Sequence, residues 1–326
     1  MPTALEQRFT VRPPVDEDIR AIIELVMALD LLHYGVADEY APDDIRDDWS
    51  HLNRETDAWA VVAPDGQLAA YATVTDHGFG RIEADGYVHP NFQGQGIGTE
   101  LVRLMETRAR DFIPSAPEHA RVVLTNSVLQ SDIPAQRIME DAGFGLARAF
   151  WRMAIDLADA PPAPQWPDGV TLRTFIPGQD DRAVFDAVEE AFKDHWDHVP
   201  HEFDEWMERT KRESFDPTLW FLAMDGAEIA GVTLCRLRPD ESAWINTVAV
   251  RRSWRKRGLG LALLHHAFAE FYRRGIQHAA LGVDAQSLTG ATRLYERAGM
   301  HVSLRIATYQ KELRPGVDLS TQTLHE

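Results

Sequence analysis

Two neighbouring stretches in the second half of the chain decide the fold class: Trp244-Ile-Asn-Thr-Val-Ala-Val250 and Arg255-Lys-Arg-Gly-Leu-Gly260. The first is rich in β-branched and aromatic residues and predicts a strand. The second is a Gly-rich turn that leads into a helix, since apolar residues follow at helical spacing at Leu264, Phe268, Phe271 and Tyr272. Such a turn presents unpaired backbone N–H groups at the positive end of a helix dipole, which favours a phosphate or pyrophosphate ligand.

The spacing of the glycines narrows the class of ligand. It is not the GxGxxG of a dinucleotide-binding fold, and it does not end in the Gly-Lys-Ser/Thr of a nucleotide P-loop. Both nucleotide-binding classes are therefore disfavoured, while an anion-binding turn remains.

The same pattern occurs a second time in the chain. Val88-His-Pro-Asn-Phe-Gln93-Gly-Gln-Gly-Ile-Gly98 matches the region of Val250 to Gly260, and two further pairs of segments match in the same order. Their offsets are 160 (226 minus 66), 162 (255 minus 93) and 156 (299 minus 143). Near-constant offsets indicate a duplicated domain. We expect mixed α/β domains at 1–158 and 170–313, a proline-rich linker at 159–169, and a disordered tail at 314–326.

Composition limits the classes of function. The 326 residues are 44% hydrophobic and 26% charged, which is typical of a packed globular protein. The single cysteine, Cys235, excludes an internal disulfide, and the absence of a signal peptide or a long apolar run favours a cytoplasmic monomer or homodimer. The net charge of −18 opposes binding to nucleic acid or to an anionic membrane. It divides unequally at residue 160, into −14 (13 minus 27) and −4 (20 minus 24).

The turn motif, together with Leu294-Tyr-Glu-Arg-Ala-Gly-Met300 further along, resembles the acetyl-CoA signature of the GNAT acetyltransferase superfamily. The resemblance covers nearly the whole chain, once in each half, and implies two tandem acyl-CoA N-acyltransferase domains. It implies that acetyl-CoA is the acyl donor. In the second unit, the residues implied to bind it are Val248, Ala249, Val250, Arg255, Lys256, Arg257, Gly258, Leu259, Gly260 and Leu261. Their counterparts in the first unit are Tyr87, Val88, Gln93, Gly94, Gln95, Gly96, Ile97 and Gly98. The first turn contains no Lys or Arg, which predicts weaker binding there.

The same resemblance implies a catalytic residue. Tyr295 falls where the family places a phenol beside the sulfur of coenzyme A, so it resembles the general acid that protonates the departing thiolate. The equivalent residue of the first unit is Met139, whose thioether cannot donate a proton. We therefore expect the second domain to be catalytic and the first to be catalytically degenerate.

Residues for the amine acceptor are less clearly marked. Many family members carry a glutamate on the strand before the turn, but the second unit has Trp244, Asn246 and Thr247 there; the first unit has Glu83 and Asp85 on its strand. The other acceptor candidates lie on the histidine-rich loop after the first helix of the second unit. They are Asp194, His195 and His198. We expect acceptor binding by Asp194, His195, His198, Trp244 and Asn246, with the general base left open between a side chain and a relayed water. The spacing of His195, His198 and His201 is not that of a helical zinc motif, so no metal is expected.

The two-unit arrangement is distantly similar to the mycothiol synthases of this superfamily, in which the C-terminal domain is the active one. Trp244 stands where those enzymes have an acidic acceptor residue, which favours another amine. The leading hypothesis is acetyl transfer from acetyl-CoA to a small amine, an aminosugar or a peptide-like metabolite, by direct attack of the amine on the thioester. The alternatives are a non-catalytic acyl-CoA-binding protein and a protein N-terminal or lysine acetyltransferase. The acyl group is not fixed by the sequence.

Overall fold

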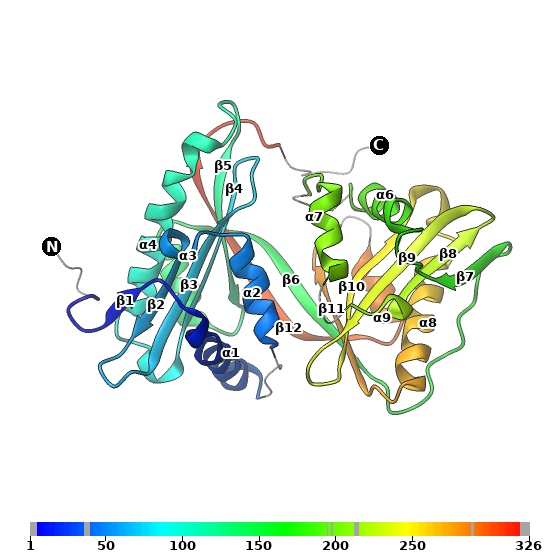
Figure 1. Cartoon of the computed structure of the whole chain (residues 1–326), viewed down its shortest axis with the longest axis horizontal. Coiled ribbons are helices and arrows are strands. Elements are labelled where there is room, and N and C mark those ends of the chain that lie inside the picture. Colours follow the sequence, from blue (N-terminus) through cyan, green and yellow to red (C-terminus); the bar gives the residue numbers. More distant parts are fainter. Residues whose placement is uncertain are drawn as a thin grey trace. The chain divides into compact units, whose positions relative to one another are not determined.

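The computed structural model describes residues 5–35, 40–193, 195–196, 198–211, 215–287 and 290–319. The chain forms two compact units (Figure 1). Unit 1 consists of Met1–Ala149 and Arg305–Leu319, and unit 2 contains Phe150–Leu304. Both are mixed α/β, as the duplicated sequence pattern predicts.

Unit 1 is built on a sheet in the order β1-β2-β3-β4-β5-β12. All neighbouring pairs are antiparallel except β4 and β5, which are parallel. Its strands are β1 (Thr10–Arg12), β2 (Ala58–Val62), β3 (Leu68–Asp76), β4 (Arg81–Val88), β5 (Val122–Leu129) and the later part of β12 (His301–Arg314). Its α-helices are α1 (Ile19–Tyr34), α2 (Pro42–Ser50), α3 (Arg54–Asp57), α4 (Ile97–Asp111) and α5 (Ile133–Asp141).

Unit 2 repeats this order as β7-β8-β9-β10-β11-β6. Here β10 and β11 are the parallel pair, and the others are antiparallel. Its strands are β7 (Val170–Thr174), β8 (Trp220–Asp225), β9 (Glu228–Leu237), β10 (Ala243–Val250), β11 (His278–Asp284) and the later part of β6 (Gly145–Asp156). Its α-helices are α6 (Asp181–Phe192), α7 (Phe203–Met207), α8 (Leu259–Arg273) and α9 (Ala291–Arg297).

The last strand of each unit comes from the other half of the sequence. In unit 2, Phe150–Asp156 of β6 pair with β11, from Asp284 opposite Phe150 to His278 opposite Asp156. In unit 1, Ile306–Arg314 of β12 pair with β5, from Leu129 to Val122. The compact units therefore differ from the sequence-based division at 158 and 170, because the closing strands are exchanged. A repeat offset cannot reveal this exchange, since equivalent strands carry equivalent patterns.

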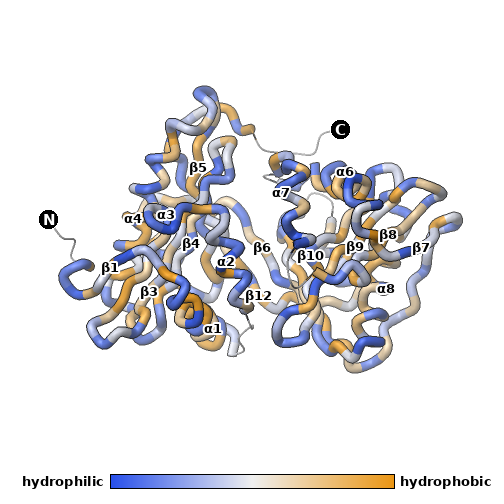
Figure 2. Tube along the Cα trace, viewed as in Figure 1, coloured by the Kyte–Doolittle hydropathy of each residue, from blue (hydrophilic) through white to orange (hydrophobic). Residues whose placement is uncertain are grey.

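Each sheet has an apolar core on both faces. In unit 2, α8 covers one face with residues such as Leu264 and Phe268, and α6 covers the other with Val184 and Phe185. In unit 1, α4 and α1 play the same parts. We call these surfaces the α8 and α6 faces of unit 2 and the α4 and α1 faces of unit 1. Figure 2 shows α2 as a largely hydrophilic helix, in keeping with its four aspartates.

Helix α8 shows how the sequence sets the element that follows the turn. Leu264, Phe268 and Phe271 are fully buried, as their spacing predicts, but Tyr272 is 41% exposed and lies off the apolar face. The helix ends where predicted: Gly275 has a left-handed φ of 81°, and the N–H of Ile276 bonds back to the carbonyl of Phe271. Within the described residues, no helix is both long enough and apolar enough to cross a membrane.

The segment after β12 is ordered further than expected from the sequence. Val317 forms a parallel bridge with Ala120, donating to His119 O and accepting from Arg121 N, both at 2.8 Å. A Cβ at Gly316 would lie 2.5 Å from the carbonyl carbon of Ala120, so only glycine permits this approach. Residues 315–319 are thus part of unit 1, and 320–326 lie outside the described residues.

Candidate functional site

The turn of unit 2 has the geometry of an anion cradle. Two residues adopt left-handed conformations, Lys256 at φ 61° and Gly258 at φ 85°, and Gly258 is the N-cap of α8. The first bond within the helix runs from Ala262 N to Gly258 O, so the N–H groups of Leu259, Gly260 and Leu261 have no intrahelical partner. These three donors point out of the positive end of a fifteen-residue helix.

The three cations of this turn have different tasks. The guanidinium of Arg255 donates to Val250 O at 3.1 Å and to Ala191 O at 3.0 Å, so it ties the end of α6 to the end of β10. Lys256 and Arg257 are exposed, and neither forms an ion pair within the described part of the chain. The charges available to an anion at the turn are therefore those of Lys256 and Arg257. Arg255 mainly holds α6 and β10 together.

The turn of unit 1 has the same backbone and another source of charge. Gly94 and Gly96 have φ values of 73° and 81°, matching Lys256 and Gly258. The sequence places no cation between Gln93 and Gly98, but Arg8 donates to Gln95 Oε1 at 2.5 Å and to Gln95 O at 3.3 Å. Arg8 precedes Gln95 by 87 positions, and no local pattern could have pointed to it.

The last glycine of each turn is required for packing. A Cβ on Gly260 would lie 3.0 Å from Leu294 of α9, and one on Gly98 would lie 3.2 Å from Ile138 of α5. A Cβ on Gly94, Gly96 or Gly258 would meet nothing within 4 Å, so those three glycines serve the backbone conformation. At the last position of each turn, glycine is therefore needed because two helices approach closely there.

In each unit, the two parallel strands separate before the turn is reached. β10 and β11 pair only at Ala243 with Ala279 and Trp244 with Ala280, so the rest of β10 has no ladder partner on that side. β4 and β5 likewise stop pairing at Ala84 with Asn126. In unit 1, the buried amide of Asn126 donates to Ala84 O at 2.7 Å and bridges the strands where they part. In unit 2, the apolar Leu281 occupies the position of Asn126. The ladders make Ala280 the counterpart of Thr125, an offset of 155 (280 minus 125), and the same offset relates Leu281 to Asn126 (281 minus 126).

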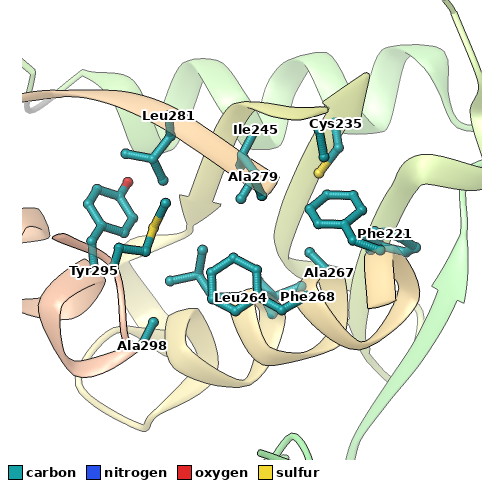
Figure 3. Packing of buried hydrophobic residues seen from close by; sticks show 14 of the residues in the cluster. Phe221, Cys235, Ile245, Leu264, Ala267, Phe268, Ala279, Leu281, Tyr295 and Ala298 are labelled. Carbon is teal, nitrogen blue, oxygen red and sulfur yellow. The ribbon is translucent and has the colours of Figure 1, made fainter. Parts of the chain in front are cut away.

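Tyr295 lies beside this separation, inside the core on the α8 face. Its ring is 8% exposed, and Figure 3 shows its hydroxyl directed toward Leu281 of β11. Burial raises the pKa of Tyr295 to about 12, so the phenol keeps its proton at neutral pH. Met139 of unit 1 occupies the equivalent core position and is 4% exposed.

The acceptor residues expected after α6 are only partly described. Asp194 lies outside the described residues. His195 stacks on Phe192, with ring centroids 4.1 Å apart, and so caps the end of α6. His198 Nε2 lies 3.5 Å from Glu189 Oε2, and His201 Nδ1 lies 2.8 Å from Glu189 Oε1. Sequence reasoning missed Glu189, although it lies on α6 next to the histidine-rich loop. No group of three or more potential metal ligands occurs in the part of the chain that the structure describes.

A β-bulge at Asn246 changes the face to which β10 directs its side chains. Pairing with β9 shifts between Ile245 and Thr247, so Ala243 and Ile245 pack in the α8 core, whereas Ala249 packs in the α6 core. Trp244 therefore points to the α6 face. Two guanidinium groups lie over the Trp244 ring, that of Arg238 at 4.6 Å from its centroid and that of Arg152 at 5.4 Å.

The ladders identify the counterparts of these residues. Trp244 pairs with Arg236 in unit 2, and Glu83 pairs with Thr75 in unit 1. Both members of the two pairs are offset by 161 residues (244 minus 83, 236 minus 75), so Trp244 is the counterpart of Glu83. Thr247 likewise corresponds to Asp85, with the extra residue Asn246 between. The carboxylates of unit 1 thus occupy the positions of Trp244 and Thr247.

The α1 face of unit 1 is acidic. Burial, reinforced by the Glu83 charge, raises the pKa of Asp85 to about 7, and burial with nearby Asp47 and Asp44 raises that of Asp48 to about 6. His77 Nε2 lies 2.9 Å from Glu83 Oε2 and lowers the pKa of that carboxyl. The ring of Tyr87 stacks on Tyr71 on the same face, at 6.5 Å and 12°.

Comparison with known proteins agrees with the two-unit pattern. The profile of the acetyltransferase (GNAT) family matches residues 23–144 and again 182–300. The chain is 32% identical over 220 residues to the mycothiol acetyltransferase of Thermobispora bispora, covering 65% of this chain and 70% of that protein. It is 28% identical over 310 residues to the mycothiol acetyltransferase of Catenulispora acidiphila, covering 89% and 94%.

Solved structures show the same architecture. A GCN5-related N-acetyltransferase from Sphaerobacter thermophilus is 44% identical, with a TM-score of 0.85 and coverage of 97% of this chain and 99% of that one. A tandem GNAT protein from the clavulanic acid biosynthesis pathway is 17% identical, with a TM-score of 0.68 and coverage of 95% and 100%. The second similarity concerns the fold alone, and it confirms the predicted tandem arrangement.

Proposed function

Because the chain belongs to the acetyltransferase (GNAT) family, we propose that unit 2 transfers the acetyl group of acetyl-CoA to the amino group of a small molecule. One observation supports this assignment above the rest. Of the two described units, only unit 2 combines exposed cations within the turn itself with a buried phenol beside the separating strands. Unit 1 has the turn but carries Met139 at the position of the phenol.

The donor is held by backbone and charge together. The pyrophosphate of coenzyme A binds the free N–H groups of Leu259, Gly260 and Leu261, with Lys256 and Arg257 adding positive charge. The pantetheine arm follows the unpaired edge of β10 and bonds to backbone groups of Val248, Ala249 and Val250, which have no ladder partner on that side. A backbone N–H on this edge polarises the acetyl carbonyl.

The chemistry is an acyl transfer without a covalent enzyme intermediate. The nitrogen lone pair attacks the thioester carbon, a C–N bond forms, the C–S bond breaks, and the sulfur leaves as a thiolate that takes a proton. Tyr295 supplies a hydrogen bond to this sulfur. With a phenol pKa of about 12, full proton transfer is favourable only if the thiol pKa also rises.

The acceptor must lose a proton before or after its attack. We assign this step to His198, with Glu189 stabilising the imidazolium that results, because the two groups lie 3.5 Å apart on the α6 side of unit 2. His195, Asn246 and Trp244 line the acceptor's approach, and Asp194 remains a candidate from the sequence alone, outside the described residues. The acceptor is an amine other than that of the mycothiol acetyltransferases, since Trp244 stands where the resemblance to those enzymes implies an acidic residue.

Unit 1 binds coenzyme A more weakly and does not transfer the acyl group. Its glycine turn retains the conformation of a cradle, through Gly94 and Gly96, with Ile97, Gly98 and the residues of β4 behind it. Arg8 supplies a cation at this turn, but it already bonds to Gln95. Tyr87 and Val88 form the strand edge that receives the pantetheine, as Val248 to Val250 do in unit 2.

The test measures release of the coenzyme A thiol from acetyl-CoA with a panel of small amines, using the full chain. Turnover with at least one amine, lost on substitution of Tyr295 by Phe while calorimetric binding of acetyl-CoA persists, supports the proposal. Binding of acetyl-CoA without turnover across the panel contradicts it and identifies a binding protein instead. Equal affinity at two sites contradicts the ranking of the units.

A further inference from the structure

Arginines gather around Trp244 on the α6 face of unit 2. Arg238, which directly follows β9, and Arg152 of β6 place their guanidinium groups 4.6 and 5.4 Å from the centre of the indole. Arg236 is the direct ladder partner of Trp244 on β9. Directly paired residues share a face of the sheet, so Arg236 lies on the face of Trp244, and the ring contact places Arg238 there as well. Two cations therefore lie over one aromatic ring, and a third is on the same face beside it.

Small residues lie between two of these side chains. On β11, which separates β6 from β10, Gly282 pairs with Arg152 and Ala280 pairs with Trp244. A Cβ built on Gly282 would meet nothing within 4 Å, so there is open space above this strand. Because β6 and β10 flank β11, their backbones are about 10 Å apart. The side chain of Arg152 reaches across β11 over this open space, since its guanidinium carbon lies 5.4 Å from the centroid of the Trp244 ring.

Aromatic side chains continue this surface along β6. Phe150 is two residues before Arg152 and so shares its face, and it contacts Trp196 from the segment after α6, with ring centroids 6.3 Å apart. The surface joins cations to aromatic rings, which suits an organic ligand that carries an oxyanion.

Unit 1 has the opposite character at the equivalent positions. Ser127 and Thr308 stand where unit 2 has Gly282 and Arg152, and their hydroxyls are hydrogen bonded at 3.0 Å across the strands. Glu83 stands in place of Trp244, with Asp85 and Asp48 nearby. The basic surface is thus specific to unit 2 and does not follow from the fold.

We propose that Arg152 and Arg238 bind an oxyanion of the acceptor, so that the substrate of unit 2 is a small amine bearing a carboxylate or a phosphate. The proposal rests on the proposed acetyl transfer and names its acceptor class. A guanidinium has five N–H donors in one plane, so it can lie over the indole and still direct a pair of donors to an oxyanion. All three arginines make further contacts, and a guanidinium can keep such contacts while other N–H donors bind an oxyanion.

This assignment gives the exchanged strand a part in specificity. Arg152 lies on β6, between the two segments that the family profile matches, 23–144 and 182–300. It precedes the proline-rich segment in the sequence, yet it belongs to unit 2. The acceptor preference of unit 2 therefore depends partly on a residue from the first half of the sequence.

The experiment compares matched amines with and without the anion in the full chain. The pairs are L-phenylalanine with 2-phenylethylamine for a carboxylate, and glucosamine 6-phosphate with glucosamine for a phosphate. Thiol release gives kcat and KM, and calorimetry on protein saturated with coenzyme A gives binding without turnover. We expect at least one anionic member to exceed its neutral partner about tenfold or more in kcat/KM, mainly through KM, because hydrogen bonds to charged groups have this strength.

Variants then locate the effect. Arg152→Gln and Arg238→Gln are expected to bring the ratio within each pair close to one, and Arg152→Lys to keep part of it. Arg273→Gln, which removes a 70% exposed arginine of α8, is the matched control and leaves the ratio unchanged. If a glutamine variant fails to fold, the lysine variant still reports the ratio.

The outcomes separate this inference from the proposed function. Equal kcat/KM and equal binding within both pairs, or a preference that persists in both glutamine variants, overturns the anionic acceptor. If no amine turns over but an anionic member binds through Arg152, acetyl transfer fails and the oxyanion site stands. If carboxylate and phosphate pairs differ, the larger ratio identifies the source of the oxyanion.

Discussion

Unit 2 places a phenol, Tyr295, where unit 1 places a thioether, Met139, and it places Trp244 and Thr247 where unit 1 places Glu83 and Asp85. The strand orders, the parallel pair and the left-handed residues of the turn are otherwise the same in both. The backbone that would hold the acyl donor is thus the same in both units, although the side chains at the reacting centre differ. A core position accepts Tyr or Met because both are large and largely apolar, so chemistry can be lost at that position while the packing is retained.

The largest effect is expected from removing the exchanged strand of unit 1. A chain ending at residue 304 lacks the strand that covers β5, including Ala307 and Tyr309, which are 4% and 2% exposed. We expect unit 1 to lose its folded state while unit 2, which keeps β6, retains it. Limited proteolysis with mass spectrometry measures this, and a chain ending at residue 319 is the control. Continued protection of residues 5–149 would show that the units do not depend on the exchange.

Substitution at the core position separates the units chemically. Tyr295→Phe removes one hydroxyl from unit 2, and we expect kcat to fall on the order of 100-fold while acetyl-CoA affinity stays the same. Met139→Leu in unit 1 is the matched change and should leave kcat unaltered. An equal loss in both variants, or no loss in Tyr295→Phe, would remove the chemical distinction between them.

The difference in charge at the two turns gives a smaller effect. Replacing Lys256 and Arg257 together by Gln is expected to weaken coenzyme A binding at unit 2 about tenfold, because charge-assisted hydrogen bonds to the pyrophosphate are lost. Arg8→Gln is the corresponding change for unit 1, and it should affect only the weaker site. Calorimetric titration with coenzyme A resolves the two sites. A strong loss at the tighter site in Arg8→Gln would reverse the assignment of the sites to the units.

The acidic face of unit 1 gives the smallest effect, in stability. The pKa of Asp85 is raised from its ordinary value of 3.8 to about 7, so its ionisation destabilises the folded state as pH rises between these values. Asp85→Asn should raise the free energy of unfolding by on the order of 1 kcal/mol above pH 7 and have little effect near pH 4. Denaturant titrations at pH 4 and 8 measure it, with exposed Asp141→Asn as control. Stabilisation of equal size at both pH values would exclude the carboxylate as the cause.

The sequence predicted the features that are local. Helix α8, its Gly275 cap and the conformation of the turn follow from neighbouring residues, and these predictions are confirmed. It did not predict the contact of Arg8 with Gln95 or the exchange of β6 and β12, which depend on residues far apart in the chain. The tie of Arg255 to Ala191 was also missed, since a basic residue in a glycine turn suggests an anion before it suggests a carbonyl. Which face Trp244 takes depends on the bulge at Asn246, and no pattern marks that bulge.

The late position of β12 also affects how the protein is made on the ribosome. Unit 2 receives β6 early, but the edge of β5, which ends at Leu129, has no partner until Ile306 is synthesised, 177 residues later (306 minus 129). At the usual 5 to 20 residues per second, this edge stays open for roughly 10 to 35 s. An open, apolar strand edge is a site for pairing with other chains. Nascent unit 1 is therefore exposed to pairing with other chains until residues 306–314 are synthesised.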